Sequence, residues 1–215
     1  MDGLRGLAIL LVVACHLVYV NPQAGAPIQF IGGVIAAGAS GVTVFFTLSG
    51  FLIALPFWRR KIKGATQVVP PGYGWRRFWK IYPPLALSVL LLLPIYLVRS
   101  SDSSFIYTAA QWLVGWPLLR PVSGRLNPVM WSLVVELHFY ALLPLLFLGL
   151  KKLSAKTCLW LVSLALLLVP TGFRWWNLSK GVQLTLHPEI NVHFPAMLDA
   201  FFFGVLLAGF NLSLT

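Results

Sequence analysis

The sequence predicts an all-α integral membrane protein, a polytopic helix bundle with about six spanning helices and a cytoplasmic N-terminus. Of its 215 residues, 59% are hydrophobic and only 10% are charged, which is more apolar surface than a soluble domain can bury. Several segments approach the ~20 apolar residues that cross a bilayer. An aromatic content of 14%, with 9 Trp, suits the belts at membrane interfaces. We therefore expect a multi-pass membrane protein, located in the cell membrane if its source is bacterial.

The apolar segments give the expected helices, at about 4–20, 33–57, 82–98, 131–150, 158–170 and 195–210. The second is rich in glycine, which favours a kink, and the fifth is short enough to need help from its flanks. An apolar piece at 105–119 is expected to form an interfacial helix. The sequence shows no internal repeat or low-complexity tract. Residues 1–215 are predicted to form a single transmembrane domain.

The basic residues predict how these segments are oriented. The chain has 16 Lys and Arg against 5 Asp and Glu, for a formal net charge of +11. Most of the basic residues fall at the N-terminus and in the 58–81 and 151–157 loops, which the positive-inside rule places in the cytoplasm. Such loops indicate contact with anionic lipid or a charged ligand, and nucleic acid is not expected as a partner. No pattern indicates an oligomeric state.

Neither a metal site nor a disulfide is expected. Cys15 and Cys158 lie in or at the edge of apolar helices and are interpreted as small buried hydrophobes. His187, Glu189 and His193 share a loop without a metal-ligand spacing.

The first predicted helix carries two ionisable residues. Arg5 and His16 are eleven residues apart, about 20° beyond three full turns, so they share a face with a rise of about 16 Å between them. Ionisable groups inside a membrane are costly and usually face a cavity or a partner. A functional pair is one interpretation. A positive-inside anchor at Arg5 and a hydrogen-bonded packing histidine at His16 are the other.

Glu136 lies about one and a half turns inside the fourth predicted helix, with Ser132 and Tyr140 on its face at i−4 and i+4. A carboxylate in hydrocarbon needs a cation, a proton or water. A pair with His16 would orient the imidazole and raise its basicity, and a structural ion pair with an arginine is the alternative. Asp199 is a second intramembrane carboxylate. A role in helix packing and a role in function are equally supported for it.

The basic loop contains the sequence WRRFWKIYP at Trp75–Pro83. Arg76, Arg77 and Lys80 can share one helix face, with aromatic residues interleaved. Taken alone, this loop favours an anchor in anionic lipid. The alternative is a site for a phosphorylated ligand, since guanidinium groups match phosphate oxygens and aromatic rings can stack on a nucleobase. Ser49 and Gly50 lie in an apolar run without a recognisable base, so packing is favoured there over a nucleophilic serine.

Five motifs together resemble the acyltransferase-3 family of membrane proteins. They are DGLRG followed by His16, GVTVFFTLSGFLI, WRRFWKIYP, WSLVVELHFYALLP and LDAFFFGVLLA, in the family's order and over most of the chain. The resemblance implies transfer of an acyl group, often acetyl, from cytoplasmic acyl-CoA to a hydroxyl of a carbohydrate or related acceptor.

The resemblance also implies roles for particular residues. Arg5 and His16 match the family's two hallmark residues, with His16 as general base or acyl relay. Glu136 matches a position that the family treats as functional, and we expect it to orient the imidazole. Arg76 and Arg77 match functional positions as well, and with Lys80 they are expected to bind the CoA phosphates. Acyl-CoA is thus the expected co-substrate, with no metal.

The chain departs from the family in two respects. Family members usually have several more spanning helices, so the chain is expected to be truncated at its C-terminus. Leu137 and His138 replace the residue types that relatives more often carry there, which puts the acceptor class in doubt. The rival interpretation is a non-enzymatic component, either transporter- or flippase-like or inactive. The unrelated membrane-bound O-acyltransferase fold is disfavoured, because its Asn and His pairing has no counterpart here.

Overall fold

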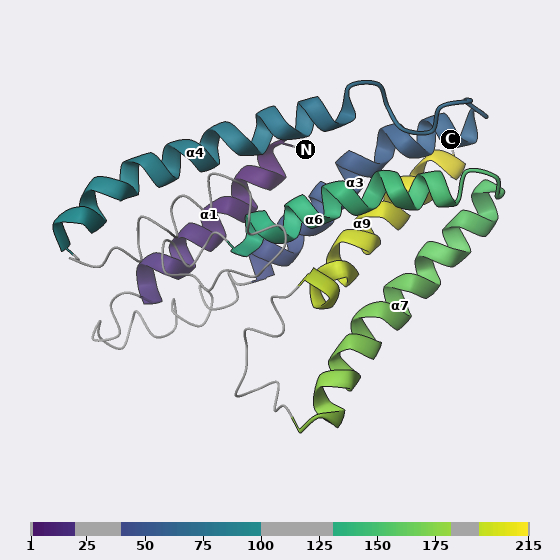
Figure 1. The fold of residues 1–215 in the computed structure, drawn as a ribbon. Helices are drawn as coiled ribbons and strands as arrows, with labels where there is room; N and C mark the ends of the chain where they lie inside the picture. The colour runs from purple at the N-terminus through teal and green to yellow at the C-terminus, as the bar shows by residue number, and fades with distance from the viewer. Residues whose placement is uncertain (1, 20–39, 100–130, 182–193, 215) are drawn as a thin grey trace. The chain divides into compact units, whose positions relative to one another are not determined.

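The computed structural model describes residues 2–19, 40–99, 131–181 and 194–214, and all regular structure in these residues is helical (Figure 1). The helices are α1 (Asp2–Tyr19), α3 (Ser40–Ile62), α4 (Tyr73–Arg99), α6 (Trp131–Gly149), α7 (Ala155–Ser179) and α9 (Phe194–Leu214). The predicted all-α class is confirmed for this part of the chain.

Three helices are long and apolar enough to cross a membrane, at Gly41–Ile62, Ala155–Ser179 and Pro195–Ser213. They correspond to the second, fifth and sixth predicted spans. The chain is accordingly a multi-pass integral membrane protein. Within α6 the apolar helix Val135–Gly149 is shorter than a span. The number of six spans and the cytoplasmic N-terminus stay predictions, and the expected interfacial helix at 105–119 falls outside the described residues.

Two helices, α4 and α7, differ most in extent from the sequence prediction. The fifth was expected at 158–170 with help from its flanks, but α7 has 25 residues because the helix continues through Pro170 to Ser179. The third was expected from residue 82, but α4 begins at Tyr73. Gly72 adopts a positive φ of 65°, which glycine tolerates, and its carbonyl accepts the Arg76 N–H at 3.1 Å. The basic segment is therefore the first part of a helix rather than a loop.

The described chain forms two compact units. One contains Met1–Arg59, Ser154–Leu168 and Leu198–Thr215, and the other contains Arg60–Leu153 and Val169–Met197. Because α3, α7 and α9 each contribute residues to both units, the prediction of a single domain over 1–215 stays open.

In the first unit, α3 and α9 approach each other at two glycines. A Cβ atom on Gly50 would lie 2.2 Å from the Phe201 carbonyl oxygen, and one on Gly204 would lie 2.0 Å from that of Thr47. The Phe46 and Phe201 rings stack at 4.5 Å between centroids. Such close approach at small residues is typical of membrane helix pairs. Gly50 is thus a packing point between the two helices, and Ser49 is buried beside it.

The contacts of α3 and α9 also give their relative direction. The indole N–H of Trp58 donates to the carbonyl of Val205 at 2.8 Å, further along both helices than the Gly50 contact with Phe201. The two helices therefore run parallel. Parallel neighbours are compatible with the second and sixth spans of the predicted topology, which cross in the same direction.

Helix α1 packs against the start of α3. A Cβ atom on Gly41 would lie 2.8 Å from the Ala8 carbonyl oxygen and 3.1 Å from the Val12 side chain. Ala8 is buried, whereas several apolar neighbours on α1 are exposed. This contact places α1, the helix that contains Arg5 and His16, beside α3. On α7, Cys158 is buried, in agreement with the interpretation as a small hydrophobe.

In the second unit, Lys61 holds the end of α6. Its ammonium donates to the carbonyl oxygens of Leu150 and Lys151 at 2.6 and 2.7 Å. A lysine at a helix C-terminus satisfies terminal carbonyls and complements the negative end of the helix dipole. This contact positions the connection between α3 and α4 against α6.

Candidate functional site

The predicted catalytic carboxylate Glu136 is buried in α6, with 4% of its surface exposed. The hydroxyl of Tyr140, one turn later, donates a hydrogen bond to its Oε1 atom. The predicted i, i+4 relation between Glu136 and Tyr140 is thus confirmed as a direct contact. A buried carboxylate is costly unless it is hydrogen-bonded, and Tyr140 supplies one such bond.

A second tyrosine joins α4 to this pair. Tyr73, the first residue of α4, is buried, and its hydroxyl donates to the backbone carbonyl of Tyr140 at 3.1 Å. Burial raises the pKa of the Tyr73 phenol well above its ordinary value, which Arg77 opposes and the Glu136 carboxylate reinforces. Tyr73 therefore keeps its proton, and remains a donor, at any physiological pH.

Arg77 lies over both tyrosines. Its guanidinium carbon is 5.5 Å from the ring centroid of Tyr73 and 5.2 Å from that of Tyr140. Both distances are within the range of a cation–π interaction. The Nε atom of Arg77 is buried, and among the described residues it has no hydrogen-bond partner. We call Tyr73, Arg77, Glu136 and Tyr140 the Arg77–Glu136 cluster.

The cluster lies along the middle of α6 rather than at its end. Tyr140 is nine residues before Gly149, the last residue of α6, which corresponds to about 14 Å along the helix. Arg77 follows Tyr73 by one turn while Glu136 precedes Tyr140 by one turn, as expected for antiparallel helices. An arginine packed against the middle of a neighbouring helix is not a surface anchor, so the lipid-anchor interpretation fits Arg77 poorly.

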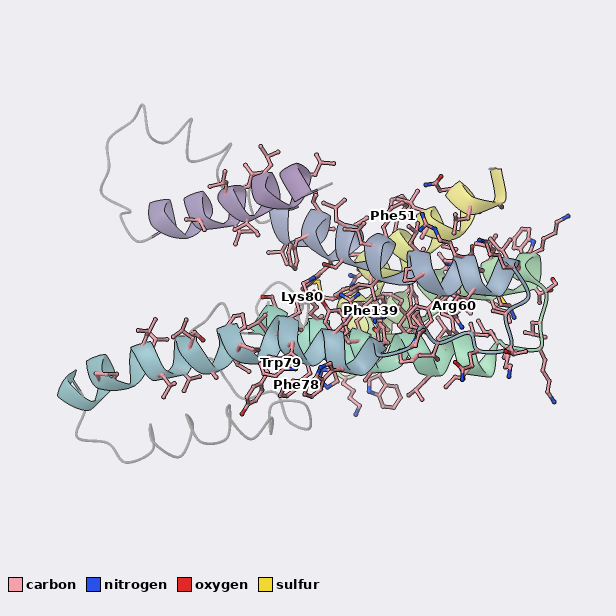
Figure 2. All side chains as sticks on the ribbon, turned by 90° about the horizontal axis from the view of Figure 1, so that it is seen from above. Phe51, Arg60, Phe78, Trp79, Lys80 and Phe139 are labelled. Carbon is pink, nitrogen blue, oxygen red and sulfur yellow. The ribbon has the colours of Figure 1, made fainter. Side chains whose placement is uncertain are left out.

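Arg76 and Lys80 differ from Arg77 in being exposed. Beside them α4 carries an exposed aromatic ridge, formed by Trp75, Phe78, Trp79 and Tyr82. Phe78 stacks on Tyr82 at 4.8 Å between ring centroids, and Trp75 stacks on Phe78 at 5.9 Å. Figure 2 shows Phe78 and Trp79 on the same side of α4, with Lys80 on another side. Of the three predicted cofactor-binding residues, Arg77 is thus half-buried, whereas Arg76 and Lys80 are exposed.

Replacing Tyr140 by phenylalanine is expected to lower the free energy of unfolding by about 1.5–3 kcal/mol, because a buried carboxylate loses a hydrogen-bond donor. The ring that packs under Arg77 is kept. Thermal unfolding of the detergent-solubilised protein measures the change. Trp160→Phe, at an exposed position of α7, is the control and is expected to unfold at the wild-type temperature. Equal unfolding temperatures for both variants would contradict a stabilising contact between Tyr140 and Glu136.

The other predicted site residues have varied outcomes. The side chains of Arg5 and His16 are outside the described part of the structure, and so are His187, Glu189 and His193, so the pairing of His16 with Glu136 stays a prediction. Asp199 is half-buried and accepts the Ala200 N–H at 2.8 Å. The described residues hold no group of three or more potential metal ligands. Tyr73 was missed, because only the register of α4 against α6 identifies it.

Comparisons with known proteins agree with the motifs. The sequence profile of a family described as "Acyltransferase domain" matches residues 1–214. The chain is similar to the acyltransferase MdmB of Streptomyces mycarofaciens, with 28% identity over 173 residues, which cover 74% of this chain and 42% of MdmB.

It is also similar to two O-acetyltransferases. The peptidoglycan O-acetyltransferase OatA of Listeria monocytogenes is 29% identical over 162 residues, which cover 67% of this chain and 23% of OatA. The O-acetyltransferase OatA of Staphylococcus aureus is 25% identical over 164 residues, which cover 67% of this chain and 24% of the relative. The chain thus spans less than half the length of these relatives. No solved structure matches it.

Proposed function

The chain belongs to the acyltransferase-3 family, and on that premise we propose that it transfers an acyl group, chiefly acetyl, from cytoplasmic acyl-CoA to a hydroxyl of a carbohydrate or related acceptor. The observation that carries the proposal is the Arg77–Glu136 cluster, in which an arginine of the basic segment on α4 and the intramembrane carboxylate on α6 both contact Tyr140. Similarity to a peptidoglycan O-acetyltransferase supports a hydroxyl acceptor of carbohydrate type.

The exposed part of α4 suits the nucleotide end of the donor. Arg76 and Lys80 offer cations for the phosphates of CoA, and the aromatic ridge offers ring faces on which an adenine can stack. The acyl thioester, at the far end of the pantetheine arm, then enters the helix bundle. This arrangement separates recognition of the nucleotide from the chemistry.

The reaction proposed at the thioester is a direct acyl transfer. His16 removes the proton from the acceptor hydroxyl, whose oxygen attacks the thioester carbonyl carbon. The bond from carbon to sulfur breaks, CoA leaves as a thiolate, and the protonated imidazole returns its proton to the sulfur. Arg5 lies near the CoA phosphates in this proposal, and Glu136 orients the imidazole. The second route is a transient acyl group on His16.

Turnover of radiolabelled acetyl-CoA in membranes that carry the chain tests this function. We expect CoA release and label in an acceptor fraction, above the level of membranes without the chain. If CoA is not released either by this chain or by a chain extended to the length of its relatives, the function is wrong. Label that crosses the membrane as intact acetyl-CoA without hydrolysis would instead identify a transporter.

The double variant Arg76→Ala, Lys80→Ala is expected to raise the KM for acetyl-CoA roughly tenfold and to leave kcat nearly unchanged, because exposed ion pairs contribute modestly to binding. The KM of the wild type is expected to rise with salt more steeply than that of the variant. Lys152→Ala, which removes an exposed charge elsewhere, is the control. An unchanged KM in the double variant would place the CoA phosphates away from α4.

A further inference from the structure

One polar group in the Arg77–Glu136 cluster is left unexplained by the packing. The carboxylate of Glu136 accepts a hydrogen bond from Tyr140, and the Tyr73 hydroxyl donates to the Tyr140 carbonyl. The Nε–H of Arg77, in contrast, is buried without a partner among the described residues. Buried donors in folded proteins are almost always paired, so this Nε–H is the donor of the cluster that a bound substrate can engage.

We infer that the Nε–H of Arg77 binds the thioester carbonyl oxygen of the acyl donor and stabilises the negative charge that develops on it during transfer. The inference rests on the proposed function. It changes the role of Arg77 from one of three phosphate-binding cations to a catalytic residue, and leaves the phosphates to the exposed Arg76 and Lys80.

The charge of Glu136 argues for a carbonyl oxygen rather than a phosphate. A CoA phosphate placed against Arg77 would bring its full negative charge close to a buried carboxylate, and like charges repel strongly where water is excluded. A thioester carbonyl is neutral when it binds and gains one negative charge only as the acceptor attacks.

The tyrosines give this donor a fixed position. The guanidinium lies 5.5 and 5.2 Å from two ring centroids on different helices, and the Tyr73 hydrogen bond to Tyr140 ties those rings together. A donor that is already oriented stabilises a developing oxyanion without reorganising at the moment of reaction. The nearby arginine charge adds to this stabilisation.

Two donor molecules separate the carbonyl from the phosphates. Acetyl-CoA carries both the thioester and the phosphates, whereas S-acetyl-pantetheine carries the thioester alone. Arg77→Lys keeps the positive charge but lacks the Nε–H, and it is expected to lower kcat by about 10²–10³ with both donors while KM for acetyl-CoA changes only a few-fold. Arg76→Ala, Lys80→Ala is expected to affect acetyl-CoA alone. Arg77→Gln, with a neutral amide donor, is measured alongside in case the lysine variant unfolds.

The outcomes distinguish the inference from the function on which it rests. A defect of Arg77→Lys that disappears with S-acetyl-pantetheine would assign Arg77 to the phosphates and overturn the inference. A defect in KM alone, or normal turnover by both Arg77 variants, would overturn it too and leave Arg77 as a packing residue. If the wild type turns over neither donor, even at the length of its relatives, the proposed function fails and the inference fails with it.

Discussion

Replacement of His16 by alanine is expected to reduce CoA release from acetyl-CoA by about 10²–10⁴-fold, the contribution of a positioned general base. Without the imidazole, the proposed general base for the proton of the acceptor hydroxyl is missing. Binding of CoA is expected to stay within a few-fold of wild type, because the nucleotide end is held elsewhere. The measurement is release of CoA from labelled acetyl-CoA in membranes, with binding followed separately.

The matched control is His138→Ala, which removes a half-buried histidine from α6. It is expected to turn over acetyl-CoA near the wild-type rate, since His138 points to a different face from Glu136. Turnover that survives in His16→Ala would remove His16 from the mechanism while family membership stands. Label that stays covalently attached to the wild-type chain, and is lost in His16→Ala, would favour the acyl relay over the general base.

Gly204→Ala is expected to separate α3 from α9 and to lower the free energy of unfolding by about 3 kcal/mol or more. The new Cβ would lie 2.0 Å from the Thr47 carbonyl oxygen and 2.6 Å from the Phe51 nitrogen. Both are backbone atoms of a helix, so the clash cannot be relieved by rotating a side chain. The helices must move apart, which also strains the hydrogen bond from Trp58 to Val205.

Thermal unfolding in detergent and the amount of protein that accumulates in membranes both measure this effect. Gly172→Ala provides the control, because Gly172 lies inside α7 and has nothing within 4 Å of a Cβ at that position. That variant is expected to be neutral or slightly stabilising, since alanine favours a helix over glycine. If Gly204→Ala unfolds at the wild-type temperature, the close approach of α3 and α9 is wrong.

Local spacing was sufficient for part of the site. The apolar composition determined the helical membrane class, and the i, i+4 spacing of Glu136 and Tyr140 determined that they share a face, which their hydrogen bond confirms. These inferences depend only on the period of a helix, which the chain fixes within a few residues.

The extents of α4 and α7 could not be read from hydropathy. Tyr73 to Lys80 is too polar to be counted as part of a span, yet it is helical because Gly72 permits the turn that starts α4 and because Tyr73 and Arg77 pack on α6. In α7, a proline and an arginine interrupt the apolar run but not the helix. A hydropathy scale measures the free energy of transferring each residue into lipid, and it contains no information on how that residue packs against a neighbouring helix.

By itself, the sequence determined which family the chain belongs to, which residues share a helix face, and where the ionisable groups of each helix lie. Only the tertiary structure decided that Arg77 packs against Tyr140 while Arg76 and Lys80 are exposed. It also decided that Tyr73 is linked to Glu136 through Tyr140, and that Gly50 and Gly204 pack directly against the backbone of a neighbouring helix. The physical reason is that helical periodicity is set by neighbours along the chain. The register between two helices is instead set by the packing of side chains far apart in sequence, and no local pattern records it.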